Sequence, residues 1–253
     1  MRKKSIFFKI IIFILFCFNL FAAKEKVYII GTDVHFPPFE FKDENGVLKG
    51  IDIELLENLA KNQNFKYKIK QLKFSELEEA LKAGEIDAIF SGMMITEERK
   101  NNFDISDKYF VSGITMGVHQ DSEIDSYEDL TGKFVAVNKR TRISNIVDQL
   151  ASEHKFIITN LDDTINIIED VEANLVHACF DDAVLLQYYI KNGAKIKLVS
   201  QRENEIGCGV IVEKGKNKEL LDKINTGLKN LKKSGKYHEI LKKYLALNVI
   251  YNY

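Results

Sequence analysis

Asp87-Ala-Ile-Phe-Ser-Gly-Met-Met-Ile-Thr-Glu-Glu-Arg99 joins a short apolar strand to a small-residue turn and the start of a helix. The apolar run up to Phe90 predicts a buried strand, and Gly92 allows the backbone of the turn to approach another group closely. Thr96 is expected to cap the helix through its hydroxyl. Arg99 follows one turn later, where its guanidinium can bind a carboxylate through two parallel hydrogen bonds. From this stretch alone, an anion site and an ordinary strand–helix junction with a solvated arginine are equally good interpretations.

Residues 1–23 have the pattern of a secretory signal peptide. Four basic residues lie within the first nine positions, and an uncharged run over residues 10–23 follows that is short for a membrane span. We therefore expect export to the periplasm after cleavage, with membrane anchoring by an uncleaved signal as the alternative. Loss of the four positive charges takes the formal net charge from −1 to −5, since residues 1–23 contain no acid. An acidic exported protein without a basic aromatic patch is not expected to bind nucleic acid.

The cysteine and histidine pattern gives no sign of a metal or cofactor. Cys179 and Cys208 are the cysteines that remain after residue 23, and both lie in apolar, strand-like segments. Export permits a disulfide between them, and two buried free thiols are the alternative. The histidines are scattered along the chain and have no metal-ligand spacing.

The first part of the mature chain alternates strands and helices. Strands are predicted over residues 26–31, 65–72 and 87–90, and helices over residues 50–60 and from Phe74 to Gly84. This order indicates a parallel sheet covered on both sides by helices. Ligands of such sheets bind at the carboxyl ends of the strands, where Asp33, Phe74 and Ser91 are expected to converge with Phe36.

The loop over residues 33–41 places three aromatic side chains around Pro37-Pro38. Aromatic residues in a surface loop suit a ligand cleft, where a flat apolar ring stacks on the ligand. We expect Phe36 to form such a wall, and Phe39 or Phe41 to pack in the core.

A second α/β unit of similar size follows. Strands are predicted over residues 111–119, 133–138, 156–159 and 176–180, and helices over residues 126–130, 144–154, 164–171 and 183–191. The chain then returns with a strand over residues 208–212, a helix capped by Asn217 and a last helix over residues 237–245. We therefore expect a discontinuous lobe 1 (residues 24–111 and 207–253) and a lobe 2 (residues 112–206). Hinges are expected near residues 111–113 and 205–208.

An ordered set of motifs makes the chain resemble the family 3 periplasmic solute-binding proteins, the polar amino-acid receptors of ABC importers. The resemblance runs from about Val27 to Tyr244. Its motifs include Gly31-Thr-Asp33, Pro37-Pro-Phe39-Glu-Phe41, Gly50-Ile-Asp-Ile-Glu54, Gly84-Glu-Ile-Asp-Ala-Ile-Phe-Ser91, Ile95-Thr-Glu-Glu-Arg99, Asp129-Leu-Thr-Gly-Lys133 and Phe180-Asp-Asp182. Each motif is weak alone, and their order along the chain is specific. The resemblance implies an α/β, two-lobed periplasmic binding protein fold of type II. Each lobe is then a wound sheet flanked by helices, and the ligand lies in the cleft between them.

The resemblance also implies a clamp for a zwitterion. Arg99 would hold the ligand α-carboxylate with help from the backbone of residues 92–94, and Asp181 of lobe 2 would pair with the α-ammonium group. Phe36 and Phe74 would sandwich the ligand side chain, whose far end meets Asp33. The implied ligand-binding residues are Asp33, Phe36, Phe74, Ser91, Gly92, Met94, Arg99, Asn138, Arg142 and Asp181. The expected partners are a free amino acid and the permease subunits of an ABC importer, which would recognise the closed form of a monomer.

Two departures from the family leave the ligand open. Met94 stands where the family often has Ser or Thr, so a hydroxyl contact is lost. Arg140 and Arg142 stand at positions that are usually small. We expect Arg140 to point to solvent. Arg142 either does the same or enters the cleft, where it would favour an acidic or polar side chain. Asp33 instead favours a cationic or amide one, and the two can also pair.

A cyclohexadienyl dehydratase, acting on arogenate or prephenate, is the alternative function on this fold. Such an enzyme needs a carboxyl acid poised in the cleft. Asp33 and Asp181 already have binding roles, so a receptor without catalysis is expected.

Overall fold

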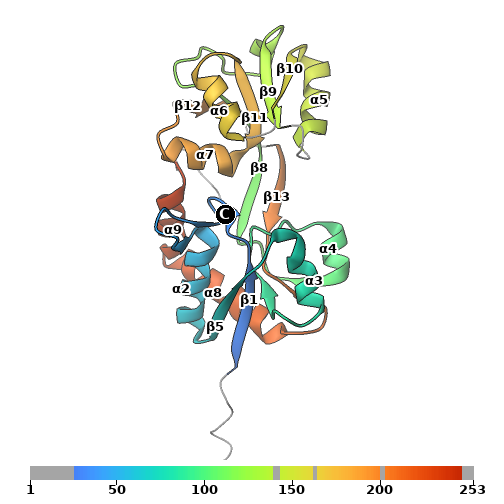
Figure 1. The fold of residues 1–253 in the computed structure, drawn as a ribbon, viewed down its shortest axis with the longest axis vertical. Helices are drawn as coiled ribbons and strands as arrows, with labels where there is room; N and C mark the ends of the chain where they lie inside the picture. Colours follow the sequence, from blue (N-terminus) through green and yellow to red (C-terminus); the bar gives the residue numbers. More distant parts are fainter. Residues whose placement is uncertain (1–25, 139–142, 162–163, 200–202, 247–253) are drawn as a thin grey trace, which may run out of the picture.

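The computed structural model describes residues 26–138, 143–161, 164–199 and 203–246. The signal peptide expected over residues 1–23 and the expected roles of Arg140 and Arg142 lie outside these residues. Two lobes lie one above the other along the long axis of the molecule, and each has its own sheet (Figure 1). Within the described ranges, no helix combines the length and the apolar character that a membrane span needs.

The lobe 1 sheet confirms the parallel arrangement that alternating strands and helices predict. Its strand order is β5-β1-β6-β14-β7. The first strand, β1 (Val27–Thr32), pairs in parallel with β5 (Lys66–Gln71) and β6 (Ala88–Ile89). The return strand β14 (Ile211–Glu213) pairs antiparallel with β6 and with β7 (Phe103–Ile105), a short strand that the sequence did not predict.

Helices cover both faces of this sheet. One side carries α2 (Ile51–Gln63), α8 (Lys218–Lys233) and α9 (Lys236–Tyr244), and the other carries α3 (Leu77–Lys82) and α4 (Glu97–Asn102) (Figure 1). A turn of 3₁₀ helix, η1 (Phe74–Glu76), precedes α3. Helices α2 and α8 approach so closely at Gly227 that an added Cβ would lie 2.6 Å from Leu59 Cδ2. Their apolar faces and the sheet form the main core of lobe 1.

A small antiparallel sheet of β2 (His35–Phe36), β3 (Glu40–Lys42) and β4 (Leu48–Lys49) holds the aromatic loop. A turn at Asn45-Gly46 joins β3 to β4, and Gly46 adopts the positive φ of 76° that glycine tolerates. Phe39 is buried in the lobe 1 core at 2% exposure, as expected.

The lobe 2 sheet has the order β10-β9-β11-β8-β12, and β13 also pairs with β8. Its strands are β8 (Phe110–His119), β9 (Phe134–Asn138), β10 (Ile157–Leu161), β11 (Ala178–Asp182), β12 (Ile196–Leu198) and β13 (Glu203–Cys208). Its helices are η2 (Glu128–Leu130), α5 (Ile143–His154), α6 (Thr164–Glu172) and α7 (Ala183–Lys191). Strands β9, β10 and β11 are mutually parallel, whereas β8 runs antiparallel to β11. The expected second wound sheet is thus present, with antiparallel strands at one side.

Strands β8 and β13 connect the lobes and pair with each other at the crossing. Phe110 lies opposite Cys208 and Ser112 opposite Ile206, and the register is irregular between Glu203 and Ile206. The hinges expected near residues 111–113 and 205–208 fall within this pairing, and their motion stays a prediction. Helix α7 of lobe 2 reaches lobe 1, where Tyr188 contacts Phe41 with ring centroids 5.9 Å apart.

The two predicted helix caps differ in whether the side chain makes a capping hydrogen bond. Thr96 begins α4 as expected, because its Oγ1 accepts a hydrogen bond of 3.2 Å from the N–H of Arg99. Asn217 is the N-cap residue of α8 as expected, but its side chain makes no capping hydrogen bond. Asn217 adopts a left-handed conformation with φ 52°, and its Nδ2 donates to the carbonyl oxygen of Asp87 instead.

The structure decides between the two states that the sequence left open for the cysteines. Cys179 and Cys208 are both buried free thiols. Burial is the main reason why the pKa of Cys179 is raised to about 12, so this thiol is unreactive in the folded protein.

Candidate functional site

A cavity of about 290 Å³ lies where the two lobes meet. Its lining comes from residues that follow β1, β5 and β6, from the end of β11 and from the two crossing strands. The lining residues are Asp33, His35, Phe36, Phe39, Phe74, Gly92, Met94, Ser112, Asp182, Ile206 and Cys208. The carboxyl ends of the strands meet here, as expected for a ligand site in a wound sheet.

Two aromatic rings form apolar walls of this cavity. Phe36 stacks on Phe39 at 5.3 Å between ring centroids, and Phe39 in turn meets Phe110 edge-on in the core. Phe74 is 43% exposed although it lines the cavity, so one ring face is available for contact. Gly92 leaves room for Phe36, because an added Cβ would lie 2.7 Å from Phe36 Cε1. The expected walls are therefore both present at the cavity.

Arg99 lies beside the cavity with its guanidinium held on three sides. Its Nε donates to Glu78 Oε1 at 2.9 Å, and its Nη1 donates to the carbonyl oxygen of Met94 at 2.9 Å. The ring of Phe74 lies 5.9 Å from Arg99 Cζ. The side chain is only 15% exposed. Among the described residues Nη2 has no protein partner, so this end of the fork is available to a ligand carboxylate.

Ser91 and the backbone of Gly92 bond to buried acids of lobe 1. Ser91 is fully buried, donates from Oγ to Glu40 Oε1 at 2.6 Å and accepts from the N–H of Asp33. The N–H of Gly92 donates to Asp52 Oδ2 at 2.7 Å. Both groups therefore already have hydrogen-bond partners within lobe 1, and Gly92 still lines the cavity.

Of the two neighbouring acids in β11, Asp182 lines the cavity, whereas Asp181 was the residue expected from the sequence to bind the ligand. Asp181 is 2% exposed, and its Oδ1 accepts from the N–H of Asp182. Asp182 accepts from Ser112 Oγ and caps α7 through the N–H of Val184. Successive side chains of a strand point to opposite faces, so only one of two adjacent acids can face the cavity.

The other expected site residues have separate outcomes. Asp33 lines the cavity, and its Oδ1 accepts from the N–H of Val34 and lies 3.2 Å from His35 Nδ1. Met94 also lines it. Asn138 ends β9 opposite Leu161 and is not part of the cavity lining, and Arg142 lies outside the described residues.

A buried carboxyl pair under the cavity was missed by the sequence analysis. Glu40 and Asp52 are at most 1% exposed, and Asp52 Oδ2 also accepts from the hydroxyl of Tyr109 at 2.7 Å. Burial is the main cause that raises the pKa of Asp52 to about 7 and the pKa of Glu40 well above its ordinary value. Each acid stands between apolar residues in sequence, Phe39 and Phe41 or Ile51 and Ile53, which was the available signal.

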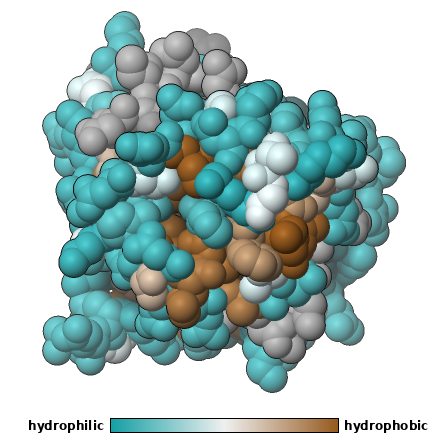
Figure 2. All heavy atoms as spheres, turned by 90° about the horizontal axis from the view of Figure 1, so that it is seen from above, coloured by the Kyte–Doolittle hydropathy of each residue, from teal (hydrophilic) through white to brown (hydrophobic). Residues whose placement is uncertain are grey.

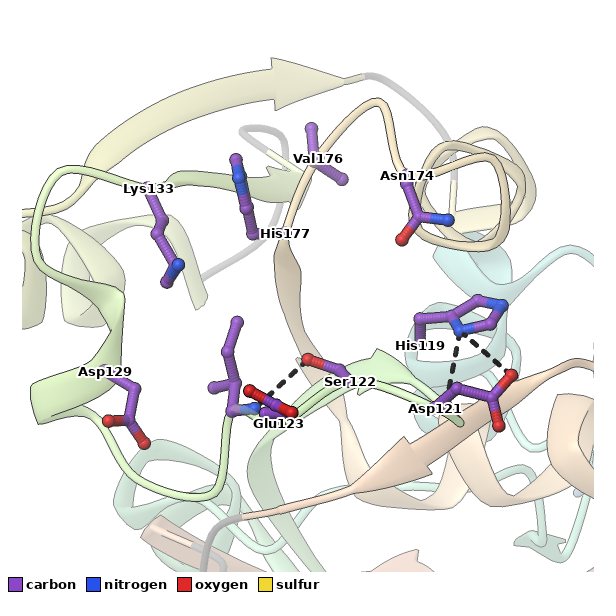
Figure 3. Close-up of a pocket in the computed structure, with 10 residues that line it drawn as sticks. His119, Asp121, Ser122, Glu123, Asp129, Lys133, Asn174, Val176 and His177 are labelled. Atoms are coloured by element: carbon purple, nitrogen blue, oxygen red, sulfur yellow. Dashed lines mark hydrogen bonds and ion pairs between the residues drawn. The ribbon is translucent and has the colours of Figure 1, made fainter.

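Two other surface features lie at the far end of lobe 2. A hollow of about 860 Å³ is bordered by polar side chains that are spread around it, with His119 bonded to Asp121 (Figure 3). Figure 2, which looks onto this end, shows hydrophobic side chains gathered on the surface. Three exposed ones are Phe134, Ile157 and Leu175. Both features belong to one lobe, so closure of the lobes cannot enclose a ligand there.

The buried pair predicts that stability depends on pH. A carboxyl group whose pKa is higher in the folded state binds more protons when folded, so the free energy of unfolding falls as pH rises from about 4 towards 7. Asp52→Asn keeps an oxygen acceptor for Gly92 and Tyr109 but cannot ionise. We expect this variant to lose a part of the pH dependence on the order of a few kcal/mol, measured by urea unfolding between pH 4 and 7. Glu57→Gln, on the exposed surface of α2, is the control. An unchanged pH dependence in Asp52→Asn would contradict the account.

Comparisons with known proteins agree on one family. The model of the bacterial extracellular solute-binding proteins, family 3, matches residues 28–247. The arginine-binding extracellular protein ArtP of Bacillus subtilis (strain 168) is 27% identical over 228 residues, which cover 89% of this chain and 88% of ArtP.

Solved structures of the same type are also similar. Substrate binding domain 2 of Lactococcus lactis GlnP, in an open conformation, has a TM-score of 0.84 at 32% identity, covering 90% of this chain and 99% of that domain. An ancestral arginine-binding protein bound to arginine has a TM-score of 0.61 at 36% identity, covering 86% of this chain and 97% of that protein. The family model spans nearly all the described residues, and the two lobes have the architecture of type II periplasmic binding proteins. The chain therefore belongs to the bacterial extracellular solute-binding proteins, family 3.

Proposed function

We propose that this protein is a receptor that captures an amino acid between its lobes and delivers it to the permease of an ABC importer. The observation that carries the proposal is the cavity between the lobes, which has Arg99 beside it on lobe 1 and Asp182 on its lobe 2 wall. An α-amino acid is a zwitterion, and each of its charges must be paired when water is excluded. A cation and an anion on separate lobes meet this requirement only when the lobes come together.

The two ends of the ligand backbone bind different lobes in this proposal. Arg99 receives the α-carboxylate, because its Nη2 end is the part of the guanidinium that the protein leaves available. Asp182 receives the α-ammonium group, which replaces the role that the sequence analysis gave to Asp181. Ser112 steadies the Asp182 carboxylate by donating a hydrogen bond to it.

The ligand side chain lies between Phe36 and Phe74 and extends towards Asp33. Aromatic faces suit an apolar stem or a cation, and a carboxylate at the far end favours a cationic or amide group. A cationic ligand is also named for ArtP, the arginine-binding relative. We propose a cationic or amide amino acid as the ligand class.

Binding is proposed to close the lobes by rotation about β8 and β13, and the permease is proposed to recognise the closed monomer. The greater likeness to an open GlnP domain than to an arginine-bound relative supports an open, unliganded conformation here. Export through a cleaved signal peptide over residues 1–23 places the receptor in the periplasm in this proposal.

A thermal-shift screen of the twenty L-amino acids tests the proposed function. A ligand at a hundred times its Kd stabilises the folded state by about 2.7 kcal/mol, so at least one amino acid should raise the Tm by about 5–10 °C.

Arg99→Ala should weaken binding of that amino acid about hundredfold or more, because the carboxylate loses its partner. Lys100→Ala, an exposed neighbour in α4, is the control. No shift with any amino acid, together with turnover of prephenate or arogenate, would support the dehydratase instead.

Substitution of the two neighbouring acids tests the assignment of the ammonium site. Asp182→Asn should weaken amino-acid binding about thirtyfold or more, because the buried ammonium group loses its counter-charge. Asparagine remains a good helix cap, so α7 should keep its stability. Asp181→Asn should retain affinity in the folded fraction, measured by calorimetric titration alongside thermal unfolding. Loss of affinity in Asp181→Asn but not in Asp182→Asn would return the role to Asp181.

A further inference from the structure

Arg99 is held from three directions before any ligand arrives, and two of the holding groups come from one short segment. Phe74 begins η1, and Glu78 lies in the first turn of α3. The ring of Phe74 faces the guanidinium, while the carboxylate of Glu78 accepts a hydrogen bond of 2.9 Å from Nε. Neither group is close to Arg99 in sequence, so the fold itself brings this pair together.

The contacts leave one particular edge of the guanidinium available. An arginine side chain has five N–H donors in a fixed planar fork. Glu78 engages Nε, and the carbonyl oxygen of Met94 engages Nη1. Among the described residues Nη2 has no protein partner, so its N–H groups remain for a ligand carboxylate.

The Arg99 end of this pair is mostly buried, whereas the Glu78 end is partly exposed. The Arg99 side chain is 15% exposed and the Glu78 side chain is 37% exposed. An isolated, flexible arginine loses side-chain entropy when it binds a ligand in one orientation. A guanidinium that is already fixed loses less, which favours binding.

We propose that Glu78 is a positioning residue, which fixes the Arg99 guanidinium through Nε so that its Nη end faces the ligand carboxylate. The inference rests on the proposed function, because it assumes that Arg99 binds the carboxylate of an amino acid. A competing role is that Glu78 occupies Arg99 in place of the ligand and must leave when the ligand binds. The two roles predict opposite effects when Glu78 is removed, because loss of a positioning group weakens binding and loss of a competitor strengthens it.

The first arm of the test needs no ligand. The sequence has five arginines, so an NMR spectrum of the arginine Nε–H groups is simple, and Arg99→Lys identifies the Arg99 signal. We expect this signal to exchange slowly with water in the unliganded protein and in Glu79→Ala, a control at the next, exposed position of α3. It should exchange rapidly in Glu78→Ala and slowly again in Glu78→Gln, which restores an oxygen acceptor. Slow exchange in Glu78→Ala would overturn the proposal.

The second arm measures affinity with the panel of twenty L-amino acids and uses the one that gives the largest shift, together with its α-carboxamide. Glu78→Ala should bind that amino acid about tenfold more weakly, the effect of losing one hydrogen bond to a charged group. Glu78→Gln and Glu79→Ala should bind within about threefold of the wild type, a difference smaller than one ordinary hydrogen bond. For the carboxamide, which lacks the anionic group, Glu78→Ala should make little difference.

The outcomes separate this inference from the proposed function. Affinity that is unchanged or stronger in Glu78→Ala, while Arg99→Ala abolishes binding, would overturn only the role of Glu78. Undiminished affinity in Arg99→Ala would instead overturn the proposed carboxylate site, and the exchange of the Nε–H group would still decide whether Glu78 fixes the guanidinium.

Discussion

The pairing of β8 with β13 is the constraint on which the arrangement of this protein depends. These strands carry the chain between the lobes, and their hydrogen bonds join the crossings into one ribbon. The loop after β6 adds to the ribbon, because Met94 bridges to Cys208 and Ile95 donates from its N–H to the carbonyl oxygen of Gly207. Lobe 1 residues next to the cavity are therefore tied directly to the crossing, so a change of angle there alters the distance between Asp182 and Arg99.

Around this crossing, the polar groups divide into those that shape the cavity and those that face it. Ser91 and the N–H of Gly92 bond to the buried acids Glu40 and Asp52, which fix the loop from below. Asp182 lines the cavity and accepts a hydrogen bond from Ser112, whereas Arg99 lies beside it and donates to Glu78. A buried charge without a partner is costly, and each of these charged side chains has at least one hydrogen-bond partner in the protein.

Local signals in the sequence were sufficient for most of the fold. The alternation of strands and helices gave both sheets, and the cap at Thr96 and the wall at Phe36 each depend on residues close in sequence. The differences between expectation and structure have a common cause in tertiary structure. Which of the adjacent acids Asp181 and Asp182 faces the cavity depends on the register of β11. The side chain of Asn217 makes no capping bond, because its Oδ1 accepts from Lys26 Nζ and its Nδ2 donates to the carbonyl oxygen of Asp87.

Glu78 shows the same limit for the site. Nothing in its own segment indicates that it bonds to a residue of another helix, because the contact exists only after α3 and α4 have packed beside the sheet. Short strands such as β7 and β2 were missed for a related reason, since two or three residues have too little periodicity to be recognised.

Small-angle X-ray scattering of the mature protein, with and without the amino acid that stabilises it most, tests the central claim directly. If the ligand joins Arg99 of lobe 1 to Asp182 of lobe 2, the radius of gyration should fall on addition of saturating ligand, because the lobes close. Saturating ligand that binds without any change in the radius of gyration would contradict the claim that binding brings the lobes together.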